Sequence, residues 1–262
     1  MIDRVSALIR EVASEAILPR FGDLAPGDIT EKSPGEDVTA ADEEAERLLA
    51  RGLSGLVPGS AVIGEEAVAK RPELLDGLGQ GLVWLLDPLD GTSNFVAGST
   101  CFSTMVTLLR DGVPQAAWML SPATDTLYVA ERGSGATVDG VPLRVPAAPA
   151  WSDLRGSVLT RFLPAELKEQ ILTRAQGCRE ILPGLRCAGE EYPAVVRGTQ
   201  NFAVFWRALP WDHAPGVLFL EEAGGKAARF DGSPYRPDEP GFGILVAQTP
   251  ELWRELHEKL FD

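Results

Sequence analysis

The chain has 262 residues, enough for one large domain or two modest ones that share an interface. Its 38 acidic and 24 basic side chains give a formal net charge of −14, a field that repels nucleic acid and anionic membrane surfaces. With 2 histidines, a multi-histidine metal site is excluded, and 3 cysteines without a CxxC pair suggest neither a disulfide framework nor a thiolate zinc site. We therefore expect a cytoplasmic protein with no nucleic-acid partner and no membrane partner.

The N-terminal segment has the periodicity of two amphipathic helices. Apolar residues within 5–16 follow the i, i+3, i+4, i+7 spacing of a helix. Residues 22–38 are rich in glycine and proline and predict a loop with a short strand. A second apolar stripe covers 45–56, and Thr39 with Asp42 has the spacing of a capping box at its start.

Short apolar runs separated by turn residues predict a β-rich section next. We expect strands at 61–63, 82–86, 101–110, 114–121 and 126–131. A turn at Asp139-Gly140 closes this section.

A Pro/Ala stretch at 146–149 is the best candidate for a boundary. Beyond it, strands alternate with helices, which predicts an α/β half. The expected strands are 156–160, 201–206 and 243–247, and the expected helices are 164–176, 213–223 and 250–260. We therefore predict an N-terminal α+β part at 1–146 and a C-terminal α/β part at 147–262.

The most informative segment is 87–93, Asp-Pro-Leu-Asp-Gly-Thr-Ser, which directly follows the buried strand predicted at 82–86. A strand that ends there places Asp87 at the carboxyl edge of a sheet, where α/β proteins usually bind ligands. Pro88 has no backbone N–H and should turn the chain out of the strand ladder, so that Asp90 can face the same point as Asp87.

The residues after Asp90 suit an anion. Gly91 lets the backbone approach a ligand closely, and Thr92 and Ser93 supply hydroxyl and N–H groups. If a helix begins there, those N–H groups form an anion site.

A divalent cation would explain the paired aspartates. Two carboxylates about 4 Å apart repel by about 1 kcal/mol in water, or about 4 kcal/mol at an effective dielectric constant near 20. A hard cation turns this repulsion into attraction, and oxygen-only ligands suit Mg²⁺ or Ca²⁺. The alternative is a pair of turns with surface carboxylates.

Three further acidic positions are ambiguous when each is taken alone. Glu65 follows the expected strand 61–63, but it also fits an acidic loop before a solvated helix. The capping box by itself explains Asp42. Asp212 has the position of an N-cap for a helix that Gly224-Gly225 would end, with Pro215 in its first turn.

These segments, in this order, resemble the inositol monophosphatase family of magnesium-dependent, lithium-sensitive phosphatases. The matching stretches are 37–42, 63–66, 84–95 and 211–225, which span nearly the whole chain. The resemblance implies a layered αβαβα sandwich of α+β and α/β character, often assembled as a homodimer.

The resemblance also implies roles for individual residues. The metal ligands would be Glu65, Asp87, Asp90 and Asp212, with the backbone carbonyl of Leu89, for two or three Mg²⁺ ions per active site. The phosphate would be bound by Gly91, Thr92 and Ser93. Asp42 would orient Thr92, and the two would help to position and deprotonate the attacking water.

The implied activity is magnesium-dependent hydrolysis of a phosphate monoester of a small sugar, polyol or similar metabolite by metal-activated water. Phosphatases of the same fold that act on histidinol phosphate, fructose bisphosphate or a 3'-phosphonucleotide remain alternatives, as does a non-catalytic regulatory or scaffold protein. A haloacid-dehalogenase-type phosphatase is disfavoured, because its motif has one residue between the two aspartates, whereas Asp87 and Asp90 are separated by two.

The substrate contacts depart from the family pattern. Inositol-cleaving members have a glutamate seven residues before the position of Asp212, and Phe205 stands there instead. Arg207 could engage a second anionic group or be merely solvated. Gly189, Glu190 and Glu191 lie where the family contacts its substrate, and Glu191 could contact a hydroxyl or an amine. For His213, we expect packing at the start of a helix rather than base catalysis.

Overall fold

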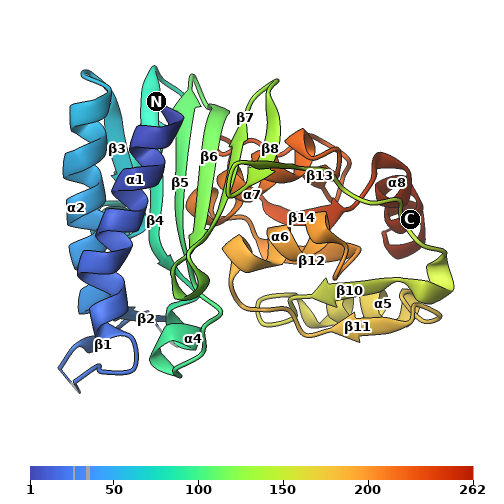
Figure 1. Ribbon diagram of the computed structural model, residues 1–262. Coiled ribbons are helices and arrows are strands. Elements are labelled where there is room, and N and C mark those ends of the chain that lie inside the picture. The colour runs from blue at the N-terminus through green and yellow to red at the C-terminus, as the bar shows by residue number, and fades with distance from the viewer. Residues whose placement is uncertain (26, 34–35, 262) are drawn as a thin grey trace.

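The computed structural model describes residues 1–25, 27–33 and 36–261; positions 26, 34, 35 and 262, three of which fall in the loop expected at 22–38, lie outside the described residues. The chain forms five layers in the order helices, sheet, helices, sheet, helices (Figure 1). The layered αβαβα sandwich expected from the sequence is therefore confirmed. None of the helices in the described part of the chain is long and apolar enough to cross a membrane.

The first outer layer consists of α1 (Ile2–Val12) and α2 (Ala40–Leu56). α1 continues as a π-helical turn, Ala13–Ile17, and a 3₁₀ turn, Leu18–Arg20. Between the two helices, β1 (Ile29–Ser33) and β2 (Glu36–Thr39) pair antiparallel, where one short strand was expected. The capping box at the start of α2 is confirmed, because the Thr39 side chain accepts from a backbone N–H and the Thr39 N–H donates to Asp42.

The second layer is a seven-stranded sheet in the order β3-β4-β5-β6-β7-β8-β9. β3 and β4 are parallel, and the remaining neighbours are antiparallel. The strands are β3 (Ala61–Gly64), β4 (Leu82–Asp90), β5 (Ser103–Arg110), β6 (Val113–Ser121), β7 (Thr126–Glu131), β8 (Gly135–Val138) and β9 (Val141–Leu143). Short helices α3 (Glu65–Lys70) and α4 (Thr92–Val96) follow β3 and β4, and 3₁₀ turns occupy Pro72–Gly77 and Pro122–Thr124.

The central layer contains α6 (Ala188–Arg197) and α7 (Pro210–Glu222), packed between the two sheets (Figure 1). α7 is apolar on all sides, as expected of a helix covered on every face. The two helices approach so closely that a Cβ atom at Gly216 would lie 2.1 Å from the Tyr192 ring.

The fourth layer is a five-stranded sheet in the order β11-β10-β12-β14-β13. Its strands are β10 (Arg155–Val158), β11 (Glu180–Leu182), β12 (Phe202–Arg207), β13 (Lys226–Arg229) and β14 (Phe242–Ala247). The last layer is formed by α5 (Ala165–Arg174) and α8 (Pro250–Leu260), and a 3₁₀ turn at Trp151–Asp153 precedes β10.

The hydrophobic core between the sheets draws on both halves of the chain. Leu85 on β4 and Phe219 on α7 belong to the same buried cluster. The chain passes from the first sheet to the second between β9 and β10, around the Pro/Ala stretch. A division into parts at residues 146 and 147 remains a prediction.

Candidate active site

The carboxyl ends of β3 and β4 bring two acidic residues together. The parallel pairing sets Gly64 opposite Leu86. The next residue along each segment, Glu65 or Asp87, therefore lies at the same edge of the sheet. The expectation that the strand ends before Asp87 was wrong, because β4 continues to Asp90. An irregularity in the pairing with β5 between Asp87 and Asp90 accommodates Pro88 within the strand.

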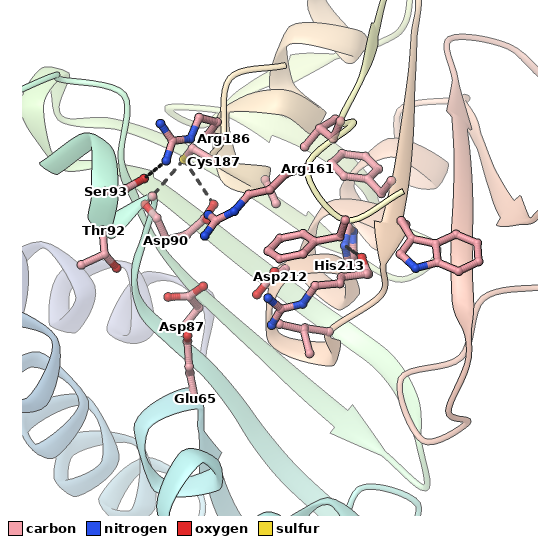
Figure 2. Close-up of a pocket in the computed structure, with 18 of the residues that line it drawn as sticks. Glu65, Asp87, Asp90, Thr92, Ser93, Arg161, Arg186, Cys187, Asp212 and His213 are labelled. Carbon is pink, nitrogen blue, oxygen red and sulfur yellow. Dashed lines mark hydrogen bonds between the residues drawn. The ribbon is translucent and has the colours of Figure 1, made fainter. Parts of the chain in front are cut away.

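Asp212 reaches the same point from the central layer. The prediction that Asp212 is an N-cap was wrong, because α7 begins at Pro210, whose fixed backbone angle suits the first position of a helix. Asp212 therefore lies inside the first turn, and Pro215 lies inside the helix. Figure 2 shows Glu65, Asp87 and Asp212 on facing sides of one pocket, and each offers a carboxylate oxygen within 4.8 Å of the others.

This set of ligands fits a hard divalent cation. Three carboxylates held this close repel one another, and the protein places one of them, Asp87, in a nearly fully buried position. Oxygen-only ligands favour Mg²⁺ or Ca²⁺ over metals that prefer sulfur or imidazole. Glu65, Asp87 and Asp212 can therefore hold a metal ion between the first sheet and α7.

The position of Glu65 depends on a carboxylate from another helix. Glu46 on α2 accepts hydrogen bonds from the backbone N–H groups of Glu66 and Ala67, both at 2.9 Å. These N–H groups have no acceptor within α3, because they lie in its first turn. A Cβ atom at Gly64 would lie 2.2 Å from the Glu46 carboxylate, so only glycine allows this cap.

Asp90 lines the same pocket but is held separately from the other three carboxylates. Its Oδ2 atom accepts from the backbone N–H of Gly189 at 2.7 Å and from the thiol of Cys187 at 3.2 Å. The Ser103 hydroxyl lies 3.4 Å from the same oxygen. Burial raises the pKa of Asp90 to about 6, despite these donors.

Thr92 joins the pocket to Asp42. Its hydroxyl lies 3.1 Å from Asp42 Oδ1 and 2.9 Å from the Leu89 carbonyl oxygen. The other carboxylate oxygen of Asp42 accepts from the N–H and the hydroxyl of Thr39, at 2.8 and 2.6 Å. Burial, reinforced by the charges of Glu65 and Glu66, raises the pKa of Asp42 to about 7. Asp42 can therefore accept a proton near neutral pH.

The predicted phosphate-binding segment begins α4. Gly91 is its N-cap with φ of 84°, and a Cβ atom there would lie 3.0 Å from the Cys101 carbonyl oxygen. The backbone N–H groups of Thr92 and Ser93 open the helix and have no intrahelical acceptor. Arg186 donates to the Ser93 hydroxyl at 2.9 Å, which brings a positive charge to this end of the pocket.

The pocket has a volume of about 340 Å³, within the size range of small-molecule sites. Phe205 and Arg207 line it, as does His213. The His213 imidazole is buried, with Nε2 2.9 Å from the Arg207 carbonyl oxygen and Nδ1 2.9 Å from the Tyr192 hydroxyl. Because a carbonyl can only accept, Nε2 carries the proton, and burial lowers the pKa of His213 to about 4. The expected packing role of His213 agrees with this geometry.

Three predicted substrate contacts are not brought to the pocket. The N–H of Gly189 binds Asp90, and the Glu190 carboxylate accepts from Ser121 on β6. Glu191 is fully buried and accepts from the hydroxyl of Ser157 and from the N–H of Leu185. Because these groups already have partners inside the protein, the function proposed below does not use them as substrate contacts.

Several residues of the pocket were not anticipated from the sequence. They are Asp37, Arg161, Arg186 and Cys187. Arg161 follows the strand expected at 156–160, so the rule that ligands lie at carboxyl ends of strands could have found it. Arg186 does not directly follow a predicted strand and belongs to no motif, so no sequence signal pointed to it. Its backbone is left-handed, with φ of 59°.

Known proteins resemble this chain over almost its whole length. The model of the inositol monophosphatase family matches residues 2–262. Inositol-1-monophosphatase of Rhizobium meliloti is 33% identical over 251 residues, covering 94% of this chain and 91% of the relative. Nus factor SuhB of Vibrio cholerae is 30% identical over 233 residues, covering 84% and 81%. The solved IMPase structure of Thermotoga maritima has a TM-score of 0.83 at 24% identity and covers 99% of this chain and 97% of that chain.

The likeness to the solved structure concerns the fold, whereas the family model and the relatives concern the sequence itself. All extend across both sheets and across the carboxylates that meet in the pocket. The chain therefore belongs to the inositol monophosphatase family, whose members are phosphoric monoester hydrolases.

Proposed function

We propose that this protein uses Mg²⁺ to hydrolyse the phosphate monoester of a small sugar, polyol or similar metabolite. The observation that carries the proposal is the convergence of Glu65, Asp87 and Asp212, from three separate elements, on one point of a pocket. Asp90 and the carbonyl of Leu89 complete the proposed ligand set for two or three ions. When bound, Mg²⁺ would lower the pKa of water and stabilise negative charge on the departing oxygen.

The chain's own residues supply a path for the proton of the attacking water. The Thr92 hydroxyl can accept a proton from water on its pocket side while it passes its own proton to Asp42. Thr39 holds the second oxygen of Asp42, so the oxygen that faces Thr92 is fixed in place. His213 does not serve as the base, because both of its ring nitrogens have partners and its pKa of about 4 makes it a weak proton acceptor.

The phosphate would lie against Gly91, Thr92 and Ser93. The N–H groups at the start of α4 and the Arg186 guanidinium are donors suited to phosphate oxygens. Close approach requires glycine at position 91, where the backbone is left-handed and a side chain would meet the Cys101 carbonyl.

Three further properties are part of this proposal. We expect inhibition by lithium, assembly as a homodimer and a cytoplasmic location. Cys101, Cys178 and Cys187 are free thiols, in keeping with a reducing compartment. Light scattering on the purified protein measures the assembly state.

A regulatory role is the second candidate, because one group of relatives carries the name Nus factor SuhB. The two functions can be separated by an Asp87→Asn variant. We expect this variant to lose phosphatase activity but to keep any regulatory function that depends only on the surface of the folded protein.

The test of the proposal is phosphate release from a panel of phosphate monoesters, including inositol, histidinol, fructose, glycerol and nucleotide phosphates. We expect release with Mg²⁺ that is abolished by a chelator and restored by excess Mg²⁺. Turnover that persists in the presence of chelator would refute the metal-dependent mechanism.

A further inference from the structure

A second wall of the pocket differs chemically from the carboxylate side. Arg161 follows the carboxyl end of β10, and Arg207 ends the parallel neighbour β12, so both reach the same edge of the second sheet. Their guanidinium carbons lie 4.8 and 4.5 Å from the centroid of one ring, that of Phe162. We call Arg161, Phe162 and Arg207 the arginine wall. In Figure 2, Arg161 extends into the pocket that Asp87 and Asp90 also line.

Buried groups fix the backbone of Arg207 in the arginine wall. The imidazole of His213 donates to the carbonyl of Arg207, and Tyr192 donates to the same imidazole. Phe205 packs against both, stacked on Tyr192 at 5.5 Å and edge-on to His213 at 4.7 Å. Arg207 thus lies at the end of a strand, and a buried imidazole holds its backbone carbonyl, which favours a specific contact.

The rest of this side of the pocket offers few hydrogen-bond acceptors. Apart from the arginine wall, the described pocket residues nearest to it in the chain are Leu159, Thr160, Phe205, Trp206, Leu209, Asp212 and His213. Of these side chains only the Thr160 hydroxyl and the Asp212 carboxylate can accept, because both nitrogens of His213 already have partners. The Asp212 carboxylate lies with Glu65 and Asp87, and guanidinium groups only donate. A polyol, whose hydroxyls must both donate and accept, is poorly matched to such a surface. An anion, which only accepts, is well matched.

We propose that the substrate is a phosphate monoester that carries a second anionic group, and that Arg161 and Arg207 bind this group. The inference rests on the proposed function, since it assumes that the scissile phosphate lies at the carboxylate side. Each charge-assisted contact should improve recognition by roughly 10- to 100-fold. A phosphate or a carboxylate can accept from the same donors.

The rival explanation is that the arginines only offset the charge of the pocket carboxylates. In that case their removal would affect all substrates alike. A second-anion site affects only substrates that possess the second anion. The two explanations therefore differ in the ratio between matched substrates.

The experiment compares kcat/KM within two pairs in the presence of Mg²⁺. The pairs are fructose 1-phosphate with fructose 1,6-bisphosphate, and adenosine 3'-phosphate with adenosine 3',5'-bisphosphate. We expect the protein to prefer the bisphosphate by about 10-fold or more in one pair, and that pair identifies a sugar or a nucleoside as the carrier. Arg161→Gln and Arg207→Gln should lower this preference about 10-fold, mainly through KM. Arg254→Gln removes an equal charge from α8, where Arg254 pairs with Glu251, and should leave the preference unchanged.

A binding measurement accompanies the kinetics. Calorimetric titration of each bisphosphate into the protein with chelator present reports affinity without turnover, and Arg207→Gln should weaken it where Arg254→Gln does not. Equal kcat/KM within both pairs, or a preference that survives both arginine substitutions, would overturn the inference while leaving the phosphatase intact. If no compound releases phosphate, the proposed function itself fails. The calorimetry then decides alone, because equal affinities for mono- and bisphosphates would rule out the second-anion site.

Discussion

At the scale of single residues, the site depends on buried carboxylates whose charge is costly unless something compensates for it. Asp42 is the clearest case, because burial raises its pKa from 3.8 to about 7 although Thr39 donates to it twice. The fold thus favours protonated Asp42, and the stability from this preference is present at acid pH and is lost as the pH rises through about 7. Activity should show the opposite trend, since only ionised Asp42 can accept a proton from Thr92.

The prediction for Asp42→Asn follows from this proton path. We expect kcat to fall about 100-fold or more, the range typical of a lost general base. The rise in activity through about pH 7 should disappear as well. The pH profile of kcat measures both effects. Thr92→Ala should lose a similar factor, and the double variant should be no slower than either single one. Multiplicative losses would show that Thr92 and Asp42 act independently.

Sequence patterns predicted best the part of the site that lies in one short motif. Residues 87–93 are contiguous, so their spacing alone indicated a cation and anion site. The partner of Asp90, the N–H of Gly189, lies 99 residues further along the chain, and no local pattern signals such a contact. Arg186 was missed for the same reason, whereas Arg161 follows an expected strand and Arg207 had been singled out beside Phe205.

At the scale of elements, strand ends and helix starts place each ligand. β3 and α3 deliver Glu65, β4 delivers Asp87, and the first turn of α7 delivers Asp212. The junction of β3 with α3 depends on Glu46, which caps α3 from α2. The geometry of a proposed metal ligand therefore depends on a helix that does not itself line the pocket.

Glu46→Gln tests this dependence. An amide at position 46 keeps one acceptor but turns a donor toward the N–H of Glu66 or Ala67, so we expect the free energy of unfolding to fall by about 1–2 kcal/mol. The affinity for Mg²⁺ should fall about 10-fold, as for other residues that orient ligands. Denaturant unfolding and calorimetry measure the two quantities. Glu44→Gln, on the solvent side of the same helix, is the matched control and should change the Mg²⁺ affinity little.

Elements with strong periodicity were predicted and short or atypical ones were not. The amphipathic stripe of α2 and the apolar runs of the first sheet gave clear signals. α6 was missed because Pro193 lies inside it, and β11 because it has only three residues. The start of α7 was placed too late because Asp212 resembles an N-cap, whereas Pro210 begins the helix.

At the scale of the whole molecule, the proposed metal site joins the first sheet to the central layer of helices. Asp87 belongs to the first sheet and Glu65 directly follows its strand β3, while Asp212 lies on a helix packed between the sheets. A cation held by all three would bind the folded protein and not the unfolded chain. Occupancy of the site should therefore stabilise the fold as a whole.

Thermal unfolding with increasing Mg²⁺ tests this coupling. At a 100-fold excess over the dissociation constant, a single site should add about 2.7 kcal/mol to the free energy of unfolding. Asp212→Asn should abolish most of the shift. Asp153→Asn changes the charge equally at an exposed position and should preserve it. A shift of equal size in both variants would mean that the stabilising ions bind elsewhere.

The layered architecture could be predicted because the resemblance covered nearly the whole chain and the alternation of strands and helices was plain in the C-terminal half. How the layers close over the site could not, because Gly216 against Tyr192 and Gly189 against Ser103 are contacts between distant segments. Such close approaches depend on the packed structure, and local periodicity carries no record of them.

The central claim is that Glu65, Asp87 and Asp212 together hold divalent cations. Anomalous diffraction from crystals grown with Mn²⁺ in place of Mg²⁺ locates bound ions directly. The account predicts anomalous density among these three carboxylates, within coordination distance of at least one oxygen from each. It is contradicted if the density lies elsewhere, or if these carboxylates bind no ion at a saturating concentration of Mn²⁺.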